Sequence, residues 1–223
     1  MKILLNNCGK SFHRQWLYRN LNFTFEFPTG NNPQITALLG ANGSGKSTFC
    51  LMLIQQVFPT EGTIEWQNET GKVIPSTEAI KYCSLASPAL ELPEELSLQE
   101  WFEFHRAIKP LYSELNLDYL IQICQFPKNI KQKAIATFSS GMKQRVKLCA
   151  AFFSQSKLLV LDEPLTNLDS KGNELFAYLL TKHHHNRYII IASNRPDEYR
   201  YCTHSLEISN QAIIESPLAI NFE

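Results

Sequence analysis

Apolar and polar residues alternate along parts of the first third of the chain, and this pattern predicts strands. Between Leu21 and Phe27 every second residue is apolar, which is the period of a half-buried strand. Met1–Asn7 and Ile35–Leu39 are further segments of strand length, and Thr63–Trp66 is typical of an edge strand. As a helix, Ser47–Phe58 is apolar around most of its circumference, so we expect it to pack inside the fold.

From about residue 94 to residue 150 the pattern changes to the period of helices. Ser97 followed by Glu100 is a capping-box pattern ahead of an apolar helix, which Pro110 ends. Strands separated by helices, as in the later segments, predict an α/β fold with a parallel sheet and crossover helices. These segments are helices at Leu115–Phe126, Gly141–Ser154 and Gly172–Lys182, strands at Leu158–Leu161 and Tyr188–Ala192, and a hairpin at Leu206–Ile214.

Composition and charge narrow the class of protein. The chain has 223 residues, of which 44% are apolar, and its 21 Lys and Arg residues balance 21 Asp and Glu residues. Because there is no basic excess, we expect no non-specific binding to nucleic acid. Six cysteines without a C-x-x-C pair favour a reduced protein over a disulfide framework or a zinc site. No apolar run reaches the ~18 residues of a membrane helix, and the start does not resemble a signal peptide, so we expect a soluble cytoplasmic chain.

The segment from Gly40 to Ser47 matches G-x-x-x-x-G-K-[ST] between a predicted strand and a predicted helix. Its glycines let successive backbone N–H groups face an anion, and the following helix adds its positive N-terminus. Lys46 is expected to reach the β- and γ-phosphates of a nucleotide, and the Ser47 hydroxyl is expected to bind Mg²⁺. The predicted nucleotide-binding residues of this segment are Gly40, Asn42, Gly43, Gly45, Lys46, Ser47 and Thr48.

A second candidate segment is the apolar strand Leu158–Leu161, which runs into Asp162 and Glu163. An acid at the carboxyl end of a central strand holds Mg²⁺ in nucleotide-binding folds, which predicts that role for Asp162. Glu163 is placed to orient or deprotonate an attacking water, so we predict that it is the catalytic base.

With these motifs the chain resembles the nucleotide-binding subunit of ABC transporters over nearly its whole length. The segment Phe138–Arg145 is similar to the family's L-S-G-G-Q signature and the basic helix after it. Asp162–Pro164 is followed by Thr166–Asp169, which is similar to the family's D-loop. Pro59-x-x-Gly62-x-Ile64 also follows the P-loop helix as it does in that family.

The resemblance implies a P-loop NTPase core with a mostly parallel sheet, an N-terminal antiparallel β lobe and a helical lobe. We expect residues 1–84 and 151–223 to form the ATP-binding core, and residues 85–150 to form the helical lobe with the signature motif. It further implies an ATPase that uses ATP and Mg²⁺, with an integral membrane transporter subunit as partner. Such a subunit lies peripherally on the cytoplasmic face of the membrane.

The family also implies a head-to-tail homodimer or heterodimer. Each ATP would lie between the P-loop of one subunit and Ser139 and Gly141 of the other, with Asp169 of the D-loop also at the site. A helix that opens at the signature can direct its N-terminus toward the γ-phosphate, so loss of that phosphate would release the dimer. Upstream, Phe12 is predicted to stack on adenine and Trp16 is its rival; for either ring, packing alone is an equally good interpretation.

The sequence departs from the family at the signature and at two loops. In the signature, Ser140 replaces a glycine and Met142 replaces the glutamine. Leu85 or Ser84 occupies the place of the Q-loop glutamine.

Asn194 stands where the family has its switch histidine. Its amide can hydrogen-bond a γ-phosphate, but it has no titratable ring. Because Lys46 and Glu163 are retained, we predict ATP hydrolysis that is slower than in a subunit with the full set, with Glu163, Lys46 and Asn194 as catalytic residues.

Two functions fit these motifs. The first is an ATPase subunit that drives or gates transport by a separate membrane protein. The second is a regulatory ATPase whose nucleotide-dependent dimerisation controls a soluble partner. The transported substrate and the direction of transport are properties of the membrane partner.

Overall fold

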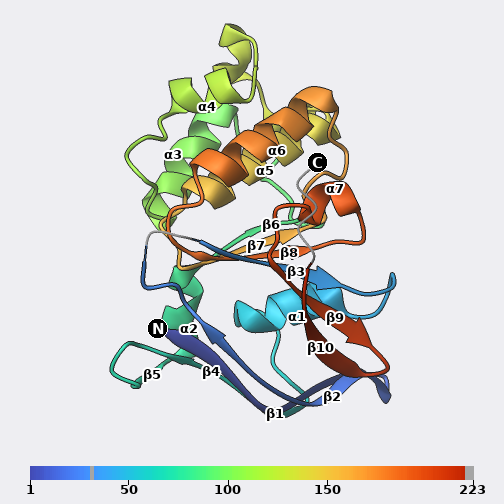
Figure 1. Ribbon diagram of the computed structural model, residues 1–223. Helices are drawn as coiled ribbons and strands as arrows, with labels where there is room; N and C mark the ends of the chain where they lie inside the picture. The colour runs from blue at the N-terminus through green and yellow to red at the C-terminus, as the bar shows by residue number, and fades with distance from the viewer. Residues whose placement is uncertain (31–32, 219–223) are drawn as a thin grey trace. The chain divides into compact units, whose positions relative to one another are not determined.

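The computed structural model describes residues 1–30 and 33–218 (Figure 1). These residues pack into two compact units, which are described separately here. The first, which we call the α/β unit, comprises Met1–Ser84, Ser156–Asp162 and the described residues from His185 onward. The second, the helical unit, comprises Leu85–Gln155 and Glu163–His184. The sequence predicts that residues 151–223 belong to the ATP-binding core, whereas in the structure residues 151–155 and 163–184 pack with the helical unit.

An antiparallel sheet forms one layer of the α/β unit, with the strand order β2-β1-β4-β5. The first two strands form a long hairpin, because His13 and Arg14 adopt positive φ angles of 47° and 66° in a two-residue turn. Both strands therefore extend beyond the segments expected from the apolar pattern alone. The strands are β1 (Lys2–Phe12), β2 (Gln15–Glu26), β4 (Glu61–Gln67) and β5 (Val73–Ile74).

A six-stranded sheet has the order β10-β9-β3-β8-β7-β6. Strand β3 pairs in parallel with β8 and β9, β7 pairs in parallel with β8, and β9 pairs antiparallel with β10. All residues of β7 and β8 are buried, as expected for parallel strands covered on both faces. The strands are β3 (Gln34–Leu39), β6 (Cys83–Ala86), β7 (Leu158–Asp162), β8 (Tyr188–Ala192), β9 (His204–Ser209) and β10 (Ala212–Pro217). The predicted fold class is confirmed.

Helix α1 (Lys46–Leu53) lies between the two sheets of the α/β unit (Figure 1). Its Phe49 ring packs edge-on against Tyr18 of β2. The predicted helix to Phe58 is wrong, because α1 ends at Leu53. There the Trp66 indole of β4 donates to the Leu53 carbonyl at 2.9 Å, and Gln55 turns the chain with a φ of 63°. The remaining short helices of the unit are α2 (Ser76–Ala79), η1 (Ile80–Tyr82) and α7 (Pro196–Tyr199).

Every α-helix of the helical unit begins at a residue whose side chain accepts a backbone N–H. The Ser97 hydroxyl accepts from the Glu100 amide at 3.2 Å, and the Glu100 carboxylate accepts from the Ser97 amide at 2.8 Å, so the predicted capping box is confirmed. Asn116, Ser139 and Asp169 cap the other helices. The helices are α3 (Leu98–Ile108), α4 (Leu117–Ile123), η2 (Lys128–Gln132), η3 (Ile135–Thr137), α5 (Ser140–Phe153) and α6 (Ser170–Lys182).

All six cysteines are buried and none forms a disulfide. Cys124 and Cys149 lie with their sulfurs 3.5 Å apart inside the helical unit. Among the described residues, no helix combines the length and the apolar character that a bilayer crossing needs.

Candidate functional site

The loop from Gly40 to Gly45 joins β3 to α1, and its backbone requires glycine. Gly40, Gly43 and Gly45 have φ angles of 146°, 81° and 104°, which residues with a side chain rarely adopt. A Cβ atom on Gly40 would also lie 2.6 Å from the Ser44 hydroxyl and 2.9 Å from the Ile208 carbonyl. The glycines of the motif are therefore required by the backbone conformation of the loop. The loop leaves the N-terminus of α1 open.

Lys46 is the first residue of α1, and its side chain folds back over the loop. Its ammonium donates to the carbonyl of Gly40 at 2.7 Å and to that of Ala41 at 3.3 Å, and the residue is only 7% exposed. The Ser44 hydroxyl beside it is buried without a hydrogen-bond partner among the described residues. A buried ammonium, an unpaired hydroxyl and an uncapped helix N-terminus form a cradle suited to phosphate.

Asp162 ends β7 and is 8% exposed. Its place beside α1 is evident from Cys50, a buried residue one turn into that helix. Burial raises the pKa of the Cys50 thiol, the Asp162 carboxylate raises it further, and Lys46 opposes both. Helix α1 also packs against β7, the strand that Asp162 ends, so the two predicted motifs lie in the same region of the α/β unit.

Mg²⁺ binds through oxygen ligands and usually takes only one or two protein groups beside substrate phosphates. The Ser47 hydroxyl, exposed on the first turn of α1, and the Asp162 carboxylate provide such a set. In the described part of the chain there is no group of three His, Cys, Asp or Glu residues that would hold a metal by themselves. The residues present therefore fit Mg²⁺ bound together with a nucleotide. Thr48, the next residue of α1, is half-buried.

Asn194 follows β8, and its Nδ2 donates to Oδ1 of Asn42 at 2.9 Å. The two residues are 152 positions apart in the sequence. They meet because β3 and β8 are adjacent parallel strands, so the segments after their carboxyl ends lie at the same end of the sheet. This contact holds Asn194, which stands where the family has its switch histidine, against the phosphate loop.

Both candidate adenine-stacking rings lie at the end of the β1–β2 hairpin, and a cation covers one face of each. The Phe12 ring is 48% exposed with the Lys10 ammonium 4.8 Å from its centre. The Trp16 ring is half-buried with the Arg19 guanidinium 4.2 Å from its centre. Arg19 is itself held by two hydrogen bonds to Glu61, each of 2.9 Å.

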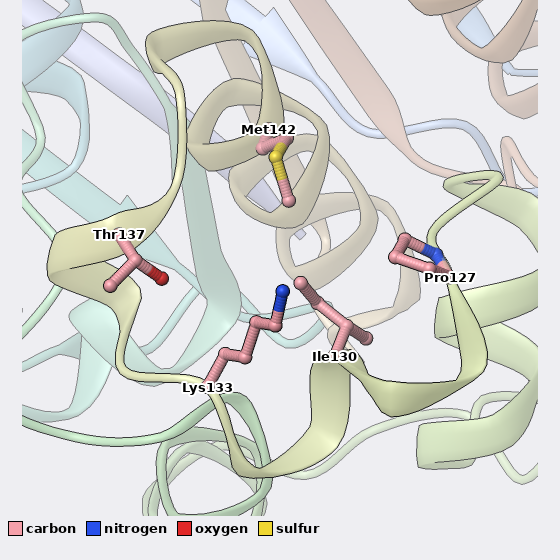
Figure 2. A pocket seen from close by; sticks show the side chains of 5 residues that line it. All are labelled: Pro127, Ile130, Lys133, Thr137 and Met142. Atoms are coloured by element: carbon pink, nitrogen blue, oxygen red, sulfur yellow. The ribbon is translucent and has the colours of Figure 1, made fainter.

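The predicted signature lies at the start of α5 in the helical unit. The Ser139 hydroxyl caps the helix by accepting from the Met142 amide at 3.2 Å. A Cβ atom on Gly141 would lie 2.8 Å from the Asn167 carbonyl, so the D-loop approaches this turn too closely for a larger residue. Met142, in place of the family's glutamine, points into a hollow of about 510 Å³ that it lines with Pro127, Ile130, Lys133 and Thr137 (Figure 2).

Glu163 follows Asp162 in the chain and has a positive φ of 45°. Its side chain is exposed, and the Thr166 hydroxyl donates to its carboxylate at 3.3 Å. Asp169 caps α6 and accepts from the Gly172 amide at 2.9 Å and from Arg145 at 2.6 Å. Those two contacts, the amide first, hold the pKa of the Asp169 carboxyl below its usual range. A non-glycine residue with a positive φ, such as Glu163, is typical of functional sites.

Three polar residues of α5 with well-defined contacts were missed by sequence reasoning. Gln144 and Arg145 contact the segment around the D-loop, and Lys147 holds the loop after β6. The Lys147 ammonium donates to the carbonyls of Ser87, Pro88 and Leu90 at 2.8, 3.2 and 3.1 Å. Burial lowers the pKa of Lys147. Gln144 and Arg145 lie in the segment that resembles the signature and its basic helix, but nothing in that pattern indicates their partners. Solvent exposure explains long polar residues on a helix equally well.

The residues in place of the Q-loop glutamine contribute no free polar group to the described site. The Ser84 hydroxyl lies 2.7 Å from the Ser156 hydroxyl inside the α/β unit, and Leu85 is apolar.

Comparison with known proteins completes the description. Residues 18–166 match the family model described as "ABC transporter". The bacitracin transport ATP-binding protein of Enterococcus faecalis is 32% identical over 165 residues, which cover 72% of this chain and 52% of that protein. The chain thus spans about half the length of this curated relative.

Two solved structures show the same fold. An ATP-binding subunit of an ABC transporter has a TM-score of 0.81 at 21% identity, covering 98% of this chain and 90% of the other. A dimeric ATP-binding cassette in a post-hydrolysis state with ADP and Pi has a TM-score of 0.76 at 19% identity, covering 97% and 99% of the two chains.

Proposed function

Since this chain belongs to the ABC transporter family and is an ATP-binding cassette ATPase, we propose that it is the ATP-hydrolysing subunit that drives or gates a separate membrane-spanning protein. Three chain segments meet at the carboxyl ends of adjacent parallel strands, and this meeting carries the proposal. They are the phosphate loop after β3, Asp162 at the end of β7, and Asn194 after β8. In open parallel sheets this end is where ligands bind.

Each residue of the α/β unit has a distinct task toward ATP. Lys46 neutralises the β- and γ-phosphates together with the amides of the glycine loop. Asn194 is near enough to the loop to exchange its bond with Asn42 for one to the γ-phosphate. Ser47 and Asp162 would hold Mg²⁺, which supplies further neutralisation of the phosphate charge when bound. Phe12, the more exposed of the two candidate rings, is our choice for stacking on adenine.

For hydrolysis we propose a direct displacement at the γ-phosphorus. A water oxygen forms a bond to the γ-phosphorus while the bond from that phosphorus to the bridging oxygen breaks, and ADP keeps the electron pair. The proton of the water passes to the Glu163 carboxylate. Asn194 and Lys46 stabilise the charge on the equatorial oxygens, but neither restores the positively charged ring of a histidine. We therefore expect modest turnover.

Dimerisation is the second part of the proposal. Ser139 and Gly141 of one subunit would close the ATP site of another, so that ATP holds the dimer together and hydrolysis releases it. The dimeric relative bound to ADP and Pi supports this arrangement. The partner subunit is either a second copy or a related chain.

The membrane-spanning partner would hold this chain at the cytoplasmic face of the membrane. The relative that is a bacitracin transport ATP-binding protein favours transport over regulation of a soluble partner. Affinity purification from solubilised membranes tests this point. Recovery of a polytopic membrane protein in stoichiometric amount is expected, and recovery of soluble proteins alone would favour the regulatory function.

Phosphate release by the purified chain with ATP and Mg²⁺ tests the enzymatic part. Release that depends on both and that stops in Lys46→Ala is expected. No release in the presence of the membrane partner would refute the proposed activity.

A further inference from the structure

We propose that the hollow beside the signature binds a small monocarboxylate with an aliphatic chain. The residues that line it are Pro127, Ile130, Lys133, Thr137 and Met142, and all belong to the helical unit. Its volume of about 510 Å³ lies within the range of small-molecule sites, which is roughly 300–1,000 Å³. The inference goes beyond the proposed function, because binding of such a ligand requires neither ATP nor a second subunit.

Most of the residues around the hollow are apolar. Ile130 is only 2% exposed, and Met142 on the first turn of α5 is half-buried. The buried rings of Phe126 and Phe138, each next in sequence to a lining residue, pack edge to face with centroids 5.9 Å apart. A methionine side chain adapts to irregular apolar shapes because it is unbranched and flexible. The greater part of a ligand that fits this hollow is therefore aliphatic.

Lys133 carries the one charge among the five lining residues. Figure 2 shows its ammonium directed toward the other side chains of the hollow. The residue is exposed, and within the described part of the chain no carboxylate forms an ion pair with it. Two neighbouring lysines are already paired, Lys131 with Asp118 and Lys143 with Glu94. The ammonium of Lys133 is therefore available to an anionic group of a ligand.

The anionic group should carry a single charge, because the lining residues offer no second donor. The Thr137 hydroxyl donates to the Ala134 carbonyl at 2.7 Å. The backbone amides of Ile130, Lys133 and Thr137 donate to carbonyls three residues earlier, and that of Met142 donates to the Ser139 hydroxyl. Proline has no N–H. A phosphate has more charge and more acceptor oxygens than one ammonium can satisfy, whereas a carboxylate matches it.

The backbone around the hollow also favours a free carboxylate over a peptide. An extended peptide docks through hydrogen bonds to unpaired backbone groups, and the amides here are already used. Three carbonyls of the lining residues are used as well. Those of Pro127 and Ile130 accept the amides of Ile130 and Lys133, and that of Lys133 accepts the Leu98 amide at 3.2 Å. A small carboxylate needs only the ammonium and the apolar surface.

The chain contains three methionines, so labelling with ¹³C-methyl methionine gives a direct readout of the hollow. Met142 lines the hollow, whereas Met52 is fully buried in the α/β unit and serves as an internal control. Met142→Leu identifies the Met142 signal. Octanoate is added to the purified chain without nucleotide, and both methyl signals are followed by NMR.

We expect octanoate to shift the Met142 methyl signal in a saturable way and to leave that of Met52 unchanged. Affinity should rise about tenfold from hexanoate to octanoate, because each buried methylene contributes about three- to fourfold. Octyltrimethylammonium has the same chain length and the opposite charge, so it should bind at least about tenfold more weakly. The absence of a saturable shift up to the solubility limit of octanoate overturns the proposal, as does equal affinity for the two octyl ligands.

Lys133→Gln tests the cation without adding a methionine signal. We expect affinity for octanoate to fall about tenfold or more, with an unchanged Met52 signal as evidence of an intact fold. Lys128→Gln is the matched control, because Lys128 is an exposed lysine of η2 that does not line the hollow. Its affinity should stay within about twofold of the wild type, since solvent screens a distant charge.

Unchanged affinity in Lys133→Gln, or an equal loss in both variants, would refute the role of this ammonium and with it the proposal. A shift of the Met142 signal by a peptide with an acidic and aliphatic C-terminus, but not by octanoate, would assign the hollow to a protein partner instead. Absence of ATP turnover would refute the proposed function and leave these binding results unaffected.

Discussion

The two units of the chain differ in how they treat the N-termini of their helices. In the helical unit all four α-helices are closed by a side chain, with Ser97, Asn116, Ser139 and Asp169 as the caps. In the α/β unit none of the three described α-helices has a side-chain cap. At α1 the glycine loop takes that position, so its N–H groups are available to an anion. The open end of α1 suits a ligand, whereas the caps of α3 and α4 serve the stability of their helices.

The units also differ in how far apart their functional residues lie in the sequence. The residues predicted to contact ATP in the α/β unit lie on or after four strands, β1, β3, β7 and β8, and Asn42 and Asn194 are 152 positions apart. Those of the helical unit lie between 139 and 169 and are joined by helix ends and side chains. The first arrangement depends on the sheet, and the second on local contacts.

Lys46→Ala tests whether the open N-terminus of α1 binds the phosphates of ATP, and it has the largest expected effect. It removes the cation proposed to donate to the β- and γ-phosphates, and each hydrogen bond from a charged group is worth about 1.5–3 kcal/mol. We expect ATP affinity to fall at least a hundredfold, measured by fluorescent nucleotide titration. Lys72→Ala, an exposed lysine of the same unit, is the control and should bind as the wild type does. Normal affinity in Lys46→Ala would rule out the phosphate loop as the binding site.

Glu163→Gln separates binding from chemistry. The substitution removes the base but keeps the side-chain volume, so ATP should still bind while hydrolysis slows by roughly 10²–10⁴. The ATP-bound dimer should accumulate and elute earlier in size-exclusion chromatography. If turnover is unchanged, another group accepts the proton.

Asn194→His tests whether Asn194 acts as a weaker substitute for the switch histidine. A histidine donor can also carry charge, so turnover should rise, with about a hundredfold as the ceiling for one improved hydrogen bond to a charged group. ATP affinity should remain within a few-fold. Asn194→Ala is the matched variant that only removes the contact with Asn42. Equal or lower turnover in Asn194→His means that Asn194 has adapted together with the altered Q-loop and is not a weakened histidine.

Ser97→Ala has the smallest expected effect and addresses the closed helix ends. Loss of the cap should lower the free energy of unfolding by about 1 kcal/mol in denaturant titrations. Ser76→Ala, at the start of the uncapped α2, should change it little. An equal loss in both variants would contradict the distinction between the units.

The same cap predicts a pH dependence. Hydrogen bonds from the Ser97 amide and hydroxyl lower the pKa of Glu100 from its ordinary value of 4.5. The contribution of ionised Glu100 to the free energy of unfolding is therefore present above pH 4.5 and is lost as the pH falls through the lowered pKa. In Glu100→Gln the decline of stability below pH 4.5 should be shallower than in the wild type.

Features that depend only on residues close together in the sequence could be predicted. The glycine loop, the strands β3, β7 and β8, and the Ser97–Glu100 capping box all follow from local pattern. The end of α1 could not, because its last carbonyl is taken by Trp66 from another strand. The contacts of Asn194 and Arg145 also depend on which elements pack together, and a polar residue gives no local sign of a distant partner.

The six buried cysteines make the native chain nearly inert toward thiol-reactive reagents. Burial raises the pKa of Cys8 to about 11 and that of Cys202 to about 12, so almost none of either is thiolate at neutral pH. A cysteine introduced at an exposed position would therefore react far ahead of the native ones. Spin labels or fluorophores placed at Lys72 and at Arg106, exposed residues of the two units, would follow domain motion during turnover without a cysteine-free background.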